Sequence, residues 1–209
     1  MKLFRRILLH MFGFLLMTLS VSIIIKTKQG AFPYDAISYY LSILIEHDFF
    51  TIGVSSIIFG LIWVILNFIV IKDVKVFWSL IIVFGFGYLM DLWFAFVLVH
   101  YNVTEMWLNG LVALGALFLL GFSLSIIISN KSLPLAPSEV FMVHIIKYTK
   151  KSWIAKIYIE MTLIVIALIL ATMAGNYEQI SWFTFVSVVL VGPFITINQK
   201  FVGKFIKDY

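Results

Sequence analysis

The sequence predicts an all-α integral membrane protein with six transmembrane helices, arranged as two inverted three-helix repeats that each add a short re-entrant or interfacial helix. Three observations support this prediction. Hydrophobic residues make up 63% of the 209 residues and charged residues only 12%, apolar stretches long enough to cross a bilayer recur along the whole chain, and a Pro-x-acid element occurs once in each half. We therefore expect a single membrane domain, 1–209, with repeats over about 1–103 and 104–209.

Six stretches are apolar enough to span a membrane. Each is about 20 residues long, which fits a hydrocarbon core about 30 Å thick at a rise of about 1.5 Å per residue. The first stretch follows Lys2, Arg5 and Arg6 as a secretory signal would, but no small-residue cleavage site comes after it, so we expect it to remain as the first helix. The stretches are residues 7–25, 51–71, 76–99, 106–129, 153–174 and 180–199.

The basic residues predict a multi-pass protein of the cell membrane with both termini in the cytoplasm. In this orientation two of the 15 Lys and Arg residues, Lys26 and Lys28, lie outside and the remaining 13 lie inside, which is a strong positive-inside bias. An odd number of spans would spoil this partition. The net charge of +5 is thereby explained by orientation and by anionic lipid headgroups, and not by nucleic acid.

The Pro-x-acid elements each open a short amphipathic segment, over about 33–47 and 137–148. Both segments are too short to span a bilayer. Because each repeat has three spans, the second repeat enters from the opposite side, and a pseudo-twofold axis in the membrane plane relates the two. Two alternatives remain open: a surface amphipathic helix, or a re-entrant helix whose N-terminal N–H groups point towards the midplane and favour an anion.

Two acidic residues lie within predicted spans, where a charge costs about 2.5 kcal/mol or more. Asp91 either lines a cavity or serves as a structural hydrogen-bond hub. Glu160 either belongs to a site or forms a local ion pair with Lys156, four residues before it. The candidate substrate-binding residues are Pro33, Tyr34, Asp35, Asp91, Pro137, Ser138, Glu139 and Glu160.

Several chemistries are not expected. The chain has no cysteine, and its four histidines show no ligand spacing, so we expect no metal site. No P-loop, nucleophile elbow or dinucleotide fingerprint occurs. We therefore expect no catalytic residue, no cofactor and no enzymatic activity.

Several short motifs resemble those of the YczE/YitT-like bacterial membrane proteins. They are Gly30-x-x-Pro33-x-Asp35, Thr51-Ile52-Gly53 at the entry to the second span, the Gly87 and Asp91 pair, and Lys156 with Glu160. The resemblance covers nearly the whole chain and implies the same fold. The chain departs from the family pattern at residues 132–136, which replace glycines, and at Glu139, which replaces an aspartate. The family has no settled biochemical activity to carry over.

Two functions are consistent with these features. The first is a small secondary transporter or permease for an unidentified small molecule, which positive helix N-termini would favour in anionic form. The second is a non-transporting membrane subunit that captures a substrate or supports a partner complex. The expected partners are the lipid bilayer, an unknown small-molecule substrate, and a partner subunit or further copies of the chain.

Overall fold

The computed structural model describes residues 2–130, 134–150 and 152–207, and every regular element in these ranges is helical, as predicted. The 3-10 helix η1 (Val74–Trp78) precedes α4, and the π-helix η2 (Trp93–Val97) follows it. The α-helices are α1 (Lys2–Thr27), α2 (Pro33–Leu44), α3 (Ile52–Ile71), α4 (Ser79–Leu92), α5 (Met106–Ser129), α6 (Pro137–Thr149), α7 (Ser152–Ala174) and α8 (Trp182–Lys207).

Six helical stretches in the described ranges are long and apolar enough to cross a membrane, which confirms the six predicted spans. The third of them consists of η1, α4 and η2 in succession. The stretches are Phe4–Thr27, Ile52–Ile71, Val74–Val97, Met106–Ser129, Ile157–Ala174 and Trp182–Val202.

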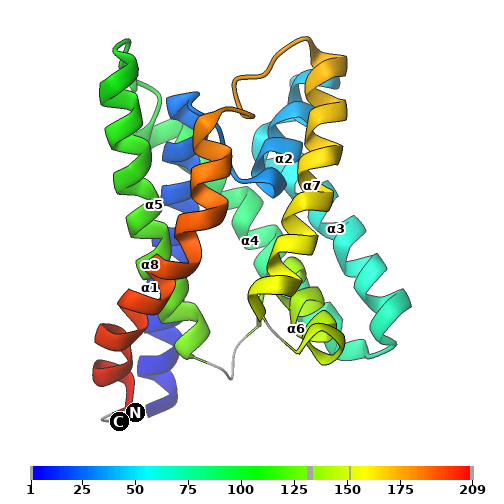
Figure 1. Ribbon diagram of the computed structural model, residues 1–209, viewed down its shortest axis with the longest axis vertical. Coiled ribbons are helices and arrows are strands. Elements are labelled where there is room, and N and C mark those ends of the chain that lie inside the picture. Colours follow the sequence, from blue (N-terminus) through cyan, green and yellow to red (C-terminus); the bar gives the residue numbers. More distant parts are fainter. Residues whose placement is uncertain (1, 131–133, 151, 208–209) are drawn as a thin grey trace.

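The long helices form two groups with α4 between them. In the first group α1 packs along α5 and α5 along α8. The second group consists of α3 and α7, which α2 and α6 connect, and α4 contacts both α3 and α1. α1 begins and α8 ends at the same end of the molecule (Figure 1), as an even number of spans requires. We call this the terminal end, and the opposite end, where α1 finishes at Thr27, the loop end.

The two short helices occupy equivalent places at opposite ends. Both α2 and α6 pack against α3 and α7, with α2 towards the loop end and α6 towards the terminal end (Figure 1). Each begins at the predicted proline, Pro33 or Pro137, and carries an acid in its first turn. Proline suits this position because an N–H there would have no acceptor within the helix.

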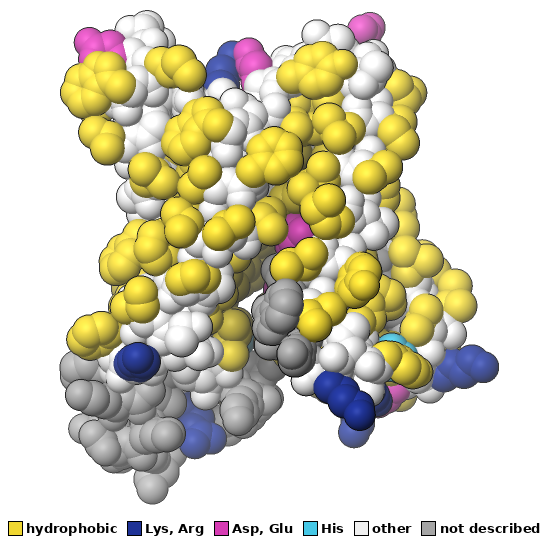
Figure 2. Space-filling view, in the orientation of Figure 1, with side chains coloured by type: hydrophobic (Ala, Val, Ile, Leu, Met, Phe, Trp, Pro, Cys, Tyr) yellow, Lys and Arg dark blue, Asp and Glu magenta, His cyan; other side chains and the backbone are white. Residues whose placement is uncertain are grey.

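The outer surface is suited to lipid. Figure 2 shows hydrophobic side chains over the middle of the face in view, with most charged side chains near the two ends. Large apolar side chains also fill the buried core, among them Ile37 and Tyr40 from α2, Leu117 from α5 and Phe183 from α8. The fold is therefore that of a multi-pass membrane protein.

Candidate functional site

The start of α2 is fixed by the loop between α7 and α8. Gly30 has a φ of +114°, and a Cβ at this position would lie 2.7 Å from the Thr184 hydroxyl oxygen, so no other residue fits without strain. The Ala31 N–H donates a hydrogen bond of 3.0 Å to the Gln179 carbonyl. The chain can then turn directly into α2 at Pro33.

Further bonds of Gln179, together with those of Glu178, join the same loop to the end of α1 and to α2. Gln179 is fully buried; its side-chain amide donates to the Ile25 carbonyl (2.9 Å), and its backbone N–H donates to the Tyr40 hydroxyl (3.1 Å). Glu178 accepts from the Tyr39 hydroxyl (3.1 Å) and pairs with Lys28 (3.2 Å). These bonds join the second half of the chain to the first at the loop end.

The electrostatics of this contact hold Tyr39 in its neutral form. Burial, followed by the negative charge of Glu178, raises the pKa of Tyr39 to about 12. The phenol therefore keeps its proton well above physiological pH and remains a donor to the carboxylate.

The first turn of α2 reaches the middle of α3. The Tyr34 ring packs against the Phe59 ring with centroids 4.8 Å apart, and Phe59 lies well inside the second span. Pro33 and Asp35 are buried, and Asp35 is only 6% exposed. The Pro33 element is therefore enclosed between helices.

The Pro137 element lies against the other half of α3. The fully buried Asn67 donates to the Pro137 carbonyl at 2.7 Å, and the Phe141 ring packs edge-on against Trp63 with centroids 5.3 Å apart. Ser138 and Glu139 are half-buried. α6 is therefore anchored to α3 about one turn before that helix ends.

Asp91 holds the beginning of α3. One of its carboxylate oxygens accepts from the Thr51 hydroxyl (2.6 Å) and the other from the Gly53 N–H (2.9 Å). Thr51 is the N-cap of α3 and in turn accepts from the Val54 N–H at 3.1 Å. A carboxylate is well placed here because the first N–H groups of a helix lack partners and its N-terminus is positive. The geometry is that of a structural hub.

A close helix contact brings Asp91 to this position. A Cβ on Gly53 would collide with the Gly87 carbonyl oxygen, and a Cβ on Gly87 would collide with the Gly53 carbonyl oxygen. Small residues at both positions let α3 and α4 approach until the Asp91 side chain spans the gap.

Glu160 lies on α7 and is 5% exposed. The side chain of Lys156, the predicted ion-pair partner, lies outside the described part of the chain, so this prediction stays untested. Burial of a carboxylate within a span nevertheless keeps Glu160 among the candidates.

The structure does not gather the candidates into one constellation. The Pro33 and Pro137 elements contact the same two helices at opposite ends. Gly53, which binds Asp91, and Asn67, which binds Pro137, are 14 residues apart on α3, or about 21 Å at about 1.5 Å per residue. Among the described residues, no group of His, Asp and Glu is arranged to hold a metal ion.

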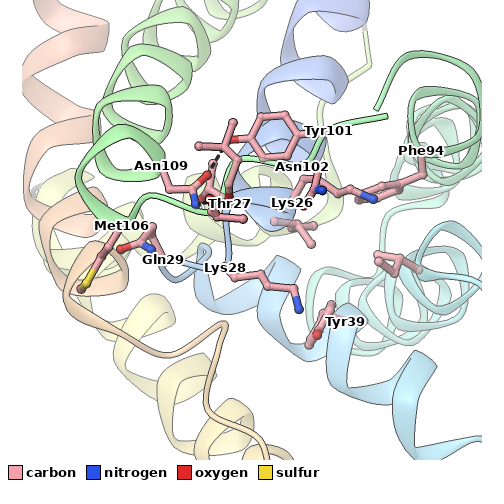
Figure 3. Close-up of a pocket in the computed structure, with 14 residues that line it drawn as sticks. Lys26, Thr27, Lys28, Gln29, Tyr39, Phe94, Tyr101, Asn102, Met106 and Asn109 are labelled. Atoms are coloured by element: carbon pink, nitrogen blue, oxygen red, sulfur yellow. Dashed lines mark hydrogen bonds between the residues drawn. The ribbon is translucent and has the colours of Figure 1, made fainter. Parts of the chain in front are cut away.

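A pocket at the loop end was not predicted from the sequence. It has a volume of about 580 Å³ and is formed by the end of α1, the middle of α2, the starts of α3 and α5, and the 98–105 loop (Figure 3). Tyr101 donates to the Asn109 side-chain oxygen (2.6 Å), and the Asn109 amide donates to the Val103 carbonyl (2.8 Å), which fixes one wall. The signal that could have indicated it is the isolated pair Lys26 and Lys28.

Six helical stretches that are long and apolar enough to span a membrane define a multi-pass membrane protein. Residues 4–200 match a family described as a family of unknown function, DUF6198, and the chain belongs to that family. No curated protein and no solved structure matches the chain.

Proposed function

We propose that this protein is a small secondary transporter, or permease, built from two inverted repeats. The observation that carries the proposal is the placement of α2 and α6 between the same two spans from opposite ends. Such half-length helices, related by an axis in the membrane plane, form the substrate sites of many secondary transporters. We also propose that the chain shares its fold with the YczE/YitT-like proteins, whose short motifs it resembles.

We propose that α2 and α6 line the path of the substrate through the membrane. α2 has 12 residues and α6 has 13, so each is about 18–20 Å long and cannot cross the bilayer. We assign α2 as re-entrant because Tyr34 reaches Phe59 within a span. The N-terminal N–H groups of α2 and α6 favour an anionic substrate.

Asp35 and Glu160 are the groups to which we assign proton coupling. Both are more than nine-tenths buried, and the helices that carry them, α2 and α7, pack against each other. Acidic residues held inside a membrane protein commonly belong to ion or proton pathways. Asp91 is assigned to the scaffold because its oxygens are occupied in capping α3.

The cell membrane is the proposed location, with both termini in the cytoplasm. Thirteen of the 15 basic residues then lie on the inner side, as the positive-inside rule requires. The terminal end is the cytoplasmic end in this assignment, and the loop end faces outward.

Uptake by proteoliposomes tests the proposal. Purified protein should accumulate at least one of four labelled anions (phosphate, acetate, benzoate or glutamate) when the outside is made acidic. Asp35→Asn should abolish the proton-driven component, whereas Asp48→Asn, which makes the same change at an exposed loop position, should retain it. Uptake of none of the four would reject an anion carrier, and binding that needs a co-purified partner would favour a capture subunit.

A further inference from the structure

The pocket at the loop end holds an uncompensated positive charge. Two lysines line it, Lys26 from the last turn of α1 and Lys28 just beyond. Glu178 already pairs with Lys28 at 3.2 Å. No carboxylate of the described residues forms an ion pair with the half-buried Lys26. We call this space the Lys26 pocket; its polar lining also includes Tyr39, Tyr101, Asn102, Thr104 and Asn109.

An apolar groove of about 560 Å³ adjoins the Lys26 pocket. Gln29 and Met106 line both spaces, and Figure 3 shows them together on one side of the Lys26 pocket. The Trp182 indole donates to the Gln29 side-chain oxygen at 3.0 Å, so this boundary is fixed. We call the groove the Trp groove; its other lining residues are Trp107, Gly110, Leu111, Leu114 and Trp182.

The Trp groove opens towards the bilayer. Trp107 is 65% and Leu111 56% exposed, and both belong to the fourth span, Met106–Ser129. Tryptophan is typical of the depth at which headgroups meet acyl chains. A basic, polar pocket at the end of the spans therefore continues into an apolar groove that a lipid can enter sideways.

We infer that the Lys26 pocket and the Trp groove together bind one phospholipid of the bilayer that has an anionic headgroup. The headgroup phosphate lies at Lys26, and one acyl chain lies against Trp107 and Leu114. Basic pockets at span ends recognise anionic headgroups in this way. A soluble anion would use only the charged half, whereas a lipid is complementary to both. The inference does not depend on whether the protein transports a solute.

Quenching of tryptophan fluorescence tests the inference, since bromine atoms on an acyl chain quench indoles that they touch. The full chain is placed in phosphatidylcholine nanodiscs that contain equal fractions of dibrominated phosphatidylglycerol or dibrominated phosphatidylcholine. The phosphatidylglycerol should bind about fivefold more tightly, the size expected of one partly exposed charge pair. This preference should decline between about 0.1 M and about 1 M salt because the pair is screened.

Two variants with matched controls separate headgroup from chain. Lys26→Gln should abolish the preference, and Lys75→Gln, the same change at an exposed site outside the pocket, should retain it. Gly110→Leu should block the groove because a Cβ there already lies 3.4 Å from Trp182. Gly115→Leu should not, because a Cβ at Gly115 meets nothing within 4 Å.

Three results would overturn the inference. One is equal quenching by the two lipids in the wild-type protein. Another is a preference that neither salt nor Lys26→Gln reduces; the salt series decides this even if the variant does not fold. The third is Lys26-dependent quenching by dibrominated stearate without any by phosphatidylglycerol, which would assign the site to a free fatty acid.

Discussion

The Asp91 carboxylate of α4 accepts hydrogen bonds from the Thr51 hydroxyl and the Gly53 N–H at the start of α3. We expect Asp91→Asn to lower stability by about 1–2 kcal/mol, because an NH2 group replaces one of the two acceptor oxygens. Asp91→Leu should cost more, because the Gly53 N–H and the Thr51 hydroxyl then both lose their acceptors. Melting temperatures of the purified protein measure the effect. Asp48→Leu, at an exposed loop position, should leave the melting temperature nearly unchanged. An Asp91→Leu protein as stable as the wild type would contradict the capping role.

The Tyr39–Glu178 hydrogen bond at the loop end makes a pH-dependent contribution to the stability of the fold. Because the pKa of Tyr39 is raised from 10.0 to about 12, its contribution is fully present below pH 10 and is lost as the pH rises through about 12. Tyr39→Phe should therefore cost about 0.5–1.5 kcal/mol below pH 10, and the difference from wild type should shrink above it. Melting curves between pH 8 and 12 test this prediction. Tyr88→Phe, which alters an exposed side chain on α4, serves as the control and should show no such trend.

At the scale of helices, the contact between α3 and α4 depends on two glycines. Gly87→Ala should destabilise the protein by about 1–3 kcal/mol, the usual cost of overpacking, because its new methyl group meets the Gly53 carbonyl and Ile57. Gly115→Ala is the matched control: the position is helical, an added Cβ meets nothing within 4 Å, and the variant should gain up to about 1 kcal/mol from better helix propensity. Equal melting temperatures for the two variants would show that the close approach is not needed.

The helices could be predicted from the sequence because their signals are local. Hydropathy sets the six spans, and Pro33 and Pro137 set the starts of α2 and α6. Contacts between helices have no local signal. The bond from Thr51 to Asp91 joins residues 40 positions apart, and it exists only because Gly53 and Gly87 pack together.

The candidate site was predictable only in part for the same reason. Asp35 and Glu160 are buried because α2 packs against α7. A single sequence does not indicate which helices pack together. The Lys26 pocket draws on several separate parts of the chain. In the sequence, Lys26 and Lys28 stand out only as the basic residues left on the outer side.

At the scale of the whole molecule, α3 links two surfaces that should lie on opposite sides of the membrane. The 45–51 loop precedes α3 and the turn at Lys72–Asp73 follows it. The 98–105 loop lies at the loop end with the first of these. From the distribution of basic residues we predict that this end faces outward.

The orientation can be tested directly because the chain has no cysteine, so single cysteines need no prior replacements. We expect Asp48→Cys and Thr104→Cys, both exposed at the loop end, to react with a membrane-impermeant maleimide on intact cells. Lys75→Cys, exposed beyond the other end of α3, should react only after permeabilisation, because six spans place it on the side of the termini, which we propose to be cytoplasmic. A permeant maleimide labels all three sites and controls for reactivity. Labelling of Lys75→Cys alone on intact cells would invert the orientation, and labelling of all three would contradict α3 as a span.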